Sequence, residues 1–184
     1  GSNGIFAGGA IKLGNTELRA SGPYPAFYAD GDVTAENSLL TATSSQDIAI
    51  YSGGGTIALT NSMVDANGAD DRDGIYSSNG VNVSGSWVKT TGSETLGDIP
   101  NSIENSVLFN GKDGKVIGDA SLPKDATIAA DMALDISEGM SLTVPEGKTL
   151  TNHGKVSVEG ALNSFGTIVC DGHDGDKMRR VPAK

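Results

Sequence analysis

The sequence has little cysteine, few aromatic residues and a deficit of positive charge, and each scarcity excludes a class of protein. Its single cysteine, Cys170, cannot form an internal disulfide or complete a zinc site of several cysteine ligands, and we expect its thiol to be buried. The 13 Lys and Arg residues against 23 Asp and Glu residues give a net charge of -10. Nucleic acids and anionic membranes bind clustered basic residues, so neither is an expected partner.

Long apolar runs and the features of a secretory start are also missing. No run approaches the roughly 18 apolar residues of a membrane span, so we expect no membrane insertion. The chain has no initiator methionine and no segment with the basic start and apolar core of a signal peptide. We therefore interpret it as a piece of a longer protein.

Glycine is abundant instead, and an aromatic repeat runs through the first half of the chain. The 26 glycines are about 14% of all residues, twice the usual proportion of roughly 7%. Phe6, Tyr28, Tyr51 and Tyr76 follow one another at intervals of 22, 23 and 25 residues. After each aromatic residue comes a glycine-rich turn and then a pair of apolar residues two positions apart, which indicates a strand. These pairs are Ile11 and Leu13, Val33 and Ala35, Ile57 and Leu59, and Val81 and Val83.

The repeat predicts an all-β fold, a single-stranded right-handed parallel β-helix in which each repeat forms one coil. A unit of about 22 residues with several short strands cannot bury its own apolar face, so it must stack on its neighbours. Stacking places like residues one coil apart, which predicts an amide ladder of Asn15, Asn37 and Asn61 that Gly85 interrupts. Further coils of the intact protein would continue the stack and cover its open edges.

The rhythm of the sequence changes along the chain and predicts four segments. Residues 1–92 form coils of about 22 residues, and residues 93–112, which contain Pro100 and fit neither rhythm, form an irregular connection. Residues 113–170 continue the β-helix with shorter glycine-spaced turns, because glycines open near-hexads such as GKVSVE and GALNSF. Residues 171–184 form a polar tail to which we assign no function.

Two stretches resemble known bacterial β-helix families. The coils GGGTIALTNSMVDANGADDRDGIYSSNGVNVSGSWVKTT resemble the carbohydrate-binding β-helix proteins of clostridial and gut bacteria, which are similar in fold to pectate lyases. The stretch SEGMSLTVPEGKTLTNHGKVSVEGALNSFGTIV resembles the glycine-spaced repeats of adhesin-like surface proteins. The resemblance implies an extracellular position on a bacterial cell surface, a glycan or host polysaccharide as partner, and bound calcium. Such ladders identify a fold better than they identify a ligand.

Alternation along the strands selects the candidate carbohydrate-binding residues Tyr28, Tyr51, Tyr76 and Trp87. If Ile50 points inward, its neighbour Tyr51 points outward, and the same reasoning applies in the other coils. An outward row of aromatic rings can stack on the C–H faces of sugars, and the tyrosine hydroxyls add polar contacts. The alternative is that the chain bends at this corner, so that the rings pack against loops or into the coil.

The acidic loop DANGADDRDG is the candidate calcium site, since Ca²⁺ takes about 6 to 8 oxygen ligands. Its candidate ligands are Asp65, Asn67, Asp70, Asp71 and Asp73. The spacing does not match an EF-hand loop, because an alanine stands where the third ligand would be. The alternative is a solvated acidic turn. A weaker candidate metal cluster in the tail contains Asp171, His173, Asp174 and Asp176.

These features favour a non-enzymatic module that binds carbohydrate or acts in adhesion. A polysaccharide lyase would need a base and a cation that stabilises the enolate, and near the acidic loop only Arg72 and Lys89 are basic. The loops are also short for walling a cleft. A purely structural stalk of a larger surface protein is the first alternative, and a polysaccharide lyase or hydrolase is the second.

Overall fold

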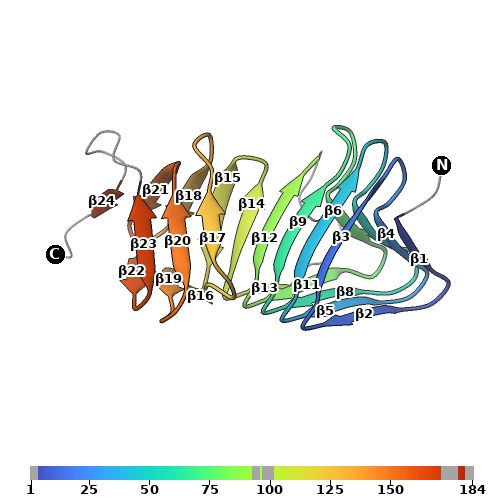
Figure 1. The fold of residues 1–184 in the computed structure, drawn as a ribbon, viewed down its shortest axis with the longest axis horizontal. Helices are drawn as coiled ribbons and strands as arrows, with labels where there is room; N and C mark the ends of the chain where they lie inside the picture. Colours follow the sequence, from blue (N-terminus) through green and yellow to red (C-terminus); the bar gives the residue numbers. More distant parts are fainter. Residues whose placement is uncertain (1–3, 93–95, 97–101, 171–177, 181–184) are drawn as a thin grey trace.

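The computed structural model describes residues 4–92, 96, 102–170 and 178–180, and the secondary structure in them consists of β-strands. Figure 1 shows the strands side by side along the long axis of the molecule, from the blue N-terminal coil to the red C-terminal one. The chain forms about seven turns of a parallel β-solenoid, with equivalent residues about 22 apart. The predicted all-β, right-handed parallel β-helix is therefore confirmed. In these residues no helix is long and apolar enough to cross a membrane.

Three sheets form the three sides of the first coils, which we call the N-terminal stack (β1 to β14). The first side contains β1 (Ile5–Ala7), β4 (Phe27–Ala29), β7 (Ile50–Ser52) and β10 (Ile75–Ser77). The second side contains β2 (Ile11–Gly14), β5 (Val33–Glu36), β8 (Ile57–Thr60), β11 (Val81–Ser84) and β13 (Ser102–Glu104). The third side contains β3 (Glu17–Gly22), β6 (Leu39–Ser44), β9 (Met63–Asn67), β12 (Trp87–Thr91) and β14 (Ser106–Asn110).

The strand register of the N-terminal stack confirms the sequence repeat. Phe6 pairs with Tyr28, which pairs with Tyr51, so equivalent side chains lie one coil apart. Inward residues form apolar ladders that are at most 7% exposed. One ladder contains Ile11, Val33, Ile57 and Val81, and another contains Phe27, Ile50 and Ile75. Burial stabilises by about 25 cal/mol per Å² of apolar surface, so these ladders hold the coils together.

Buried serines fix one corner of the N-terminal stack, between its second and third sides. Ser38, Ser62, Ser86 and Ser106 are at most 2% exposed. The Ser38 N–H donates to Ser62 Oγ at 3.0 Å, and the contact repeats at 3.1 Å from Ser62 to Ser86 and from Ser86 to Ser106. Each hydroxyl also donates to the carbonyl oxygen two residues before it. Buried polar groups need such partners, and here the partners come from adjacent coils.

A hairpin between β14 and β15 (Asp113–Ile117) reverses the chain, which sequence analysis did not predict. The two strands pair antiparallel, with Asn110 opposite Asp113. Gly111 has a φ of 59°, the conformation that the first residue of a two-residue hairpin loop requires. The loop itself is Gly111-Lys112 rather than one of the Asn-Gly, Asp-Gly or Gly-Gly pairs that mark such hairpins, so the sequence carries only the glycine as a signal.

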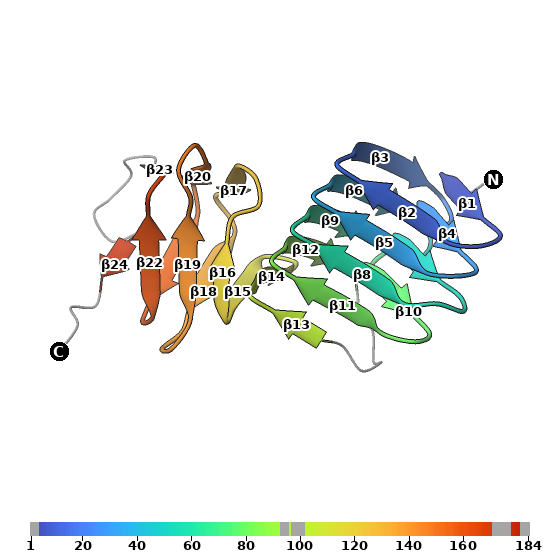
Figure 2. The same cartoon turned by 90° about the horizontal axis from the view of Figure 1, so that it is seen from below.

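The reversal moves the hydrophobic core to the opposite face of the third-side sheet, which continues unbroken from β3 to β24. Val88 and Leu108 belong to the first core, whereas Trp87, Val107 and Phe109 belong to the second. The strands of the second half run in the opposite direction, and they pack their core on the opposite face of the sheet. Either change alone would reverse the handedness of the coils. Because both occur together, the two halves wind in the same sense. Figure 2 shows the two bodies joined at β14 and β15.

The C-terminal stack comprises β15 to β24. The third side continues with β15, β18 (Ala133–Ile136), β21 (Lys155–Val158) and β24 (Met178–Arg180). The other two sides contain β16 (Asp119–Ser121), β19 (Ser141–Val144) and β22 (Ala161–Ser164), and β17 (Ala126–Ile128), β20 (Thr149–Asn152) and β23 (Thr167–Cys170). Ala133 pairs with Lys155, 22 residues further on, and Ser141 pairs with Ala161, 20 residues further on. The glycine-spaced near-hexads are therefore single sides of coils whose length is close to that of the N-terminal coils.

The segment boundaries differ from the predicted ones at the connection and at the tail. Strands β13 and β14 lie within 93–112 and belong to the N-terminal stack, so this range is not irregular over 102–110. In the tail, residues 178–180 form β24, which pairs with β21. Cys170 is exposed rather than buried, because β23 lies in a coil whose side chains are mostly exposed.

Candidate functional site

The aromatic stripe, which we define as Phe6, Tyr28, Tyr51 and Tyr76, runs along the outer surface of the first side. Successive ring centroids are 5.0, 5.3 and 5.6 Å apart, and the ring planes differ by 10°, 21° and 9°. Phe6 is 64% exposed and the three tyrosines are half-buried. The tyrosines point outward, as alternation predicts, because their neighbours in each strand fill the core.

The rings of the stripe face one another rather than the solvent. Offset stacking with centroids about 4.5–7 Å apart is a favourable aromatic geometry. Both faces of Tyr28 and of Tyr51 are therefore covered by neighbouring rings. The expected flat platform for sugar C–H faces is not what the structure presents. The stripe offers ring edges and hydroxyl groups instead.

The tyrosine hydroxyls differ in their hydrogen bonding. Tyr28 donates to Asp30 Oδ1 at 2.9 Å. This bond raises the pKa of Tyr28, because the neutral phenol is the form that can donate to the carboxylate. Within the described part of the chain, the hydroxyls of Tyr51 and Tyr76 have no hydrogen-bond partner. Each of them is free to donate and accept a hydrogen bond with a ligand.

Trp87, the fourth predicted carbohydrate-binding residue, lies on a different surface and is buried. It belongs to β12 on the third side and is only 4% exposed. Its ring packs against Phe109 with centroids 5.3 Å apart and planes tilted by 38°. Trp87 points away from the first core, as alternation predicts, but Phe109 and the rest of the second core cover it. A groove of about 380 Å³ passes beside it, between Met63 and Met132. Trp87 therefore cannot form one binding surface with the tyrosines.

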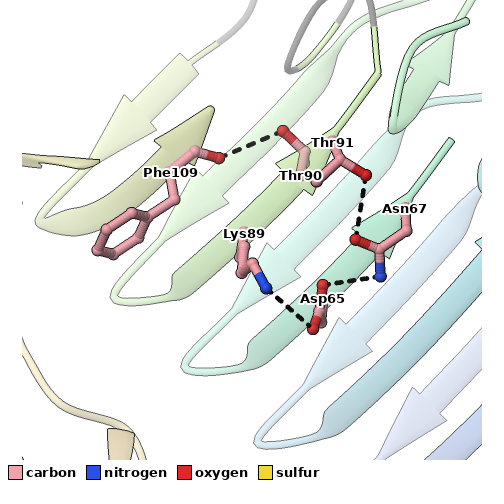
Figure 3. Close-up of polar contacts among 6 residues, drawn as sticks. All are labelled: Asp65, Asn67, Lys89, Thr90, Thr91 and Phe109. Atoms are coloured by element: carbon pink, nitrogen blue, oxygen red, sulfur yellow. Dashed lines mark hydrogen bonds and ion pairs between the residues drawn. The ribbon is translucent and has the colours of Figure 1, made fainter. Parts of the chain in front are cut away.

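The outer face of β9 and β12 carries a chain of polar contacts, shown in Figure 3. Lys89 Nζ lies 3.7 Å from Asp65 Oδ2, and Asn67 Nδ2 donates to Asp65 Oδ1 at 3.0 Å. Thr91 Oγ1 in turn donates to Asn67 Oδ1 at 3.1 Å. Cross-strand pairs of this kind contribute about 0.2–1 kcal/mol each. Two of the predicted calcium ligands are thus already paired with protein groups.

The predicted calcium ligands do not converge in the structure. Asp65 and Asn67 lie in β9, whereas Asp70, Asp71 and Asp73 follow in the turn after it. Among the described residues, no group of three or more His, Cys, Asp and Glu side chains is placed to hold a metal ion. The arrangement matches the alternative of a solvated acidic turn, and calcium binding stays a prediction. The weaker cluster of Asp171, His173, Asp174 and Asp176 lies outside the described residues.

A polar groove where the two stacks meet was missed by sequence analysis. It has a volume of about 470 Å³. Its polar lining includes Asn37, Asn61, Asn105, Asp119 and Lys124. Asn105 continues the predicted asparagine ladder and could have been found, because IENSVL at 103–108 repeats AENSLL at 35–40. Asp119 and Lys124 have no counterpart in that repeat, since they come from the reversed half of the chain.

No protein-family model, curated protein or solved structure matches this chain. The family resemblance of the coil sequences therefore stays an expectation. The solenoid fold itself is established by the strand register and the two cores. Its function has to be argued from the geometry of these surfaces.

Proposed function

We propose that this chain is a non-enzymatic module of an extracellular bacterial surface protein and that it binds a glycan along the aromatic stripe. The observation that carries the proposal is the pair of hydroxyls of the half-buried residues Tyr51 and Tyr76, which lie one coil apart without a partner in the described part of the chain. Such hydroxyls suit the hydroxyl groups of sugars, which also both donate and accept. A row of regularly spaced groups suits a polymer with a regular repeat.

The stripe is rigid before any ligand arrives. The parallel strand ladder holds the backbone of each tyrosine, and the ring stack holds its side chain. Binding therefore orders few additional torsions, and this lowers the entropic cost of association. Tyrosine also offers a large amphipathic contact area with only two side-chain torsions.

An open outer surface supports binding rather than bond cleavage. Lyases and hydrolases place acid and base groups where water is excluded, whereas the stripe is accessible to solvent. The carboxylate beside it, Asp30, is already hydrogen-bonded to Tyr28. Incubation with polysaccharides followed by assays for reducing ends and unsaturated sugars tests this point. Product release above that of a buffer control would favour a polysaccharide lyase or hydrolase instead.

A glycan array probed with the whole chain, in calcium and again in chelator, tests the binding proposal. We expect selective binding that weakens about tenfold or more in the double variant Tyr51→Phe/Tyr76→Phe, which keeps the ring stack and removes both hydroxyls. Tyr24→Phe is the matched control, because Tyr24 is 45% exposed and lies outside the stripe. Loss of binding in chelator would add calcium to the proposal. Equal weakening in the double variant and the control would contradict it.

A structural stalk is the second candidate function, and the ring stack itself favours it. Covered ring faces stabilise the contact between coils, which a spacer needs and a sugar platform does not. A blank array from a sample with an intact β-rich circular dichroism spectrum would favour the stalk. In that case Tyr51→Ala should lower the free energy of unfolding, whereas Tyr51→Phe should leave it nearly unchanged.

A further inference from the structure

The polar groove between the two stacks is a second candidate ligand site, distinct from the aromatic stripe. One wall is the asparagine corner of the N-terminal stack, and the other is the stretch from Asp119 to Lys124 in the C-terminal stack. Each stack supplies one wall, so the groove follows from the chain reversal at β14 and β15. Its volume of about 470 Å³ lies within the range of about 300–1,000 Å³ that is typical of small-molecule sites.

The asparagine corner presents free side-chain amides to this groove. Asn37 and Asn61 have φ values of 50° and 47°, in the left-handed region that asparagine tolerates. Their backbone N–H groups bond to Thr60 and Ser84 carbonyl oxygens in the next coil. Both side chains are exposed, and in the described part of the chain their amides have no hydrogen-bond partner. Two amides one coil apart are thus available to donate and accept.

Gly85 interrupts the asparagine ladder between Asn61 and Asn105. It has the same left-handed conformation as the asparagines, with a φ of 58°. A Cβ atom at this position would overlap Asn61 Oδ1, so the Asn61 side chain occupies the space beside Gly85. Beyond it, Asn105 Oδ1 accepts the Asp119 N–H at 3.0 Å and ties the two walls together.

The opposite wall adds one group of each charge. Asp119 Oδ1 accepts from Ser141 Oγ at 2.8 Å and keeps further lone pairs for a ligand. Lys124 lines the groove, and it forms no ion pair with any residue of the described segments. A mixture of donors and acceptors suits the adjacent hydroxyls of a neutral sugar. The Asp119 carboxylate and the net charge of -10 oppose an anionic ligand.

We propose that this groove binds a neutral oligosaccharide, with the Asn37 and Asn61 amides bonding to its hydroxyl groups. The inference shares with the proposed function only the class of ligand. It stands if the aromatic stripe binds nothing, and it can fail while the stripe binds.

Amide NMR spectroscopy of the whole chain, titrated with cellohexaose, xylohexaose and mannohexaose and with the acidic trigalacturonate, tests this proposal. We expect the side-chain amide signals of Asn37 and Asn61 to shift with at least one neutral hexasaccharide. Asn61→Gly should weaken that binding about threefold to tenfold, because glycine accepts the same φ and one hydrogen-bonding group is lost. Asn15→Gly is the matched control, since Asn15 has a φ of 50° in the same ladder but does not line the groove.

A second variant tests the position of the Asn61 amide. Gly85→Asn puts a Cβ atom where Asn61 Oδ1 lies and should displace the Asn61 amide, so we expect it to weaken binding in the groove. Shifts confined to the amides of Tyr51 and Tyr76 would overturn the groove and leave the proposed function standing. Shifts at the asparagines with trigalacturonate alone, or with none of the four sugars, would overturn the inference. Equal weakening by Asn61→Gly and Asn15→Gly would also overturn it.

Discussion

The two stacks share one continuous sheet but turn their corners in different ways. In the N-terminal stack, asparagines in the left-handed conformation precede buried serines that bond from coil to coil. In the C-terminal stack, Gly139 and Gly147 adopt φ values of 80° and 73°. Gly160 lets the chain pass so close to Ser137 and Met140 that a Cβ atom would overlap their carbonyl oxygens. The spacing of glycines therefore indicates where a coil turns, and it does not indicate the length of the coil.

The stacks also use opposite faces of that sheet. Leu39 and Met63 are half-buried on the outside of the N-terminal stack, in register with Trp87. One strand further, Val107 pairs with Trp87 and is buried in the second core. The same face is thus outer surface in the first coils and core in the last ones. Alternation within one coil identifies two faces, but only the direction of the chain decides which of them is covered.

The largest expected effect is at the junction, where Phe109 is fully buried against Trp87. Phe109→Ala should lower the free energy of unfolding by about 3–5 kcal/mol, because it leaves a cavity between the stacks. Phe165→Ala is the matched control, since Phe165 is 73% exposed, and should change it by about 0.5 kcal/mol or less. Urea denaturation followed by circular dichroism measures both. Equal losses would show that the second core does not depend on the junction.

The glycine corners of the C-terminal stack should be the next most sensitive. Gly160→Ala should lower the free energy of unfolding by about 3 kcal/mol, because the new methyl group meets two backbone carbonyl oxygens that cannot rotate away. Gly9→Ala, at a position with no neighbouring atom within 4 Å, should have almost no effect. Thermal unfolding of the two variants compares them. An unchanged melting temperature for Gly160→Ala would contradict the tight corner.

The serine corner of the N-terminal stack should be less sensitive than the glycine corners. Ser62→Ala removes the acceptor of the Ser38 N–H, which stays buried without a partner, at a cost of about 2 kcal/mol. Ser102→Ala, at an exposed position in β13, should be nearly neutral. Denaturation curves and amide hydrogen exchange at Ser38 test the effect. Unchanged protection of the Ser38 amide would argue against the serine ladder.

The smallest expected effect is on the pH dependence of stability, and it comes from two carboxylates, one in each stack. The Thr56 backbone N–H bonds to Asp32 Oδ1 at 2.8 Å and lowers the pKa of Asp32 below its usual 3.8. The Lys112 ammonium lies 2.9 Å from Asp131 Oδ2 and lowers the pKa of Asp131 in the same direction. Both groups therefore favour the folded state above pH 3.8, and this contribution is lost as the pH falls through their lower folded-state pKa values.

A high salt concentration should change the pKa values of these two carboxyl groups by different amounts. Screening weakens the attraction of the Lys112 ammonium, so molar salt should raise the pKa of Asp131 toward its usual value. The pKa of Asp32 should change less, because its main cause is a bond from a neutral backbone N–H group. Carbon NMR titration of the two carboxyl groups at low and high salt measures the difference. Equal salt responses would contradict these causes.

The N-terminal coils could be predicted from sequence because like residues recur at a nearly constant interval and alternate within each strand. The reversal could not be read from that pattern, since parallel and antiparallel strands alternate in the same way. Gly111, which opens the loop, is only a weak signal of the reversal. The outward direction of Trp87 was predictable, but its burial was not, because Phe109 and the second core, which cover it, lie outside its own coil.

For the candidate site, too, the sequence predicts part of the arrangement and leaves part of it open. The register of Tyr28, Tyr51 and Tyr76 follows from the repeat, so their position on one surface could be predicted. The mutual covering of their faces depends on side-chain torsions that alternation does not specify. The predicted calcium ligands do not converge: Asp65 and Asn67 lie along one face of β9, whereas Asp70 and Asp71 lie in the exposed turn after it.

The single sheet that crosses the junction has a mechanical consequence. The first-side sheet ends at β10 and the second-side sheet at β13, so among the described residues only the pairing of β14 with β15 carries backbone-to-backbone hydrogen bonds from one stack to the other. Most of the N-terminal stack has three such ladders between successive coils. A pulling force along the long axis therefore meets its weakest resistance between the stacks. Under load the module should part there first, with the coils on either side still wound.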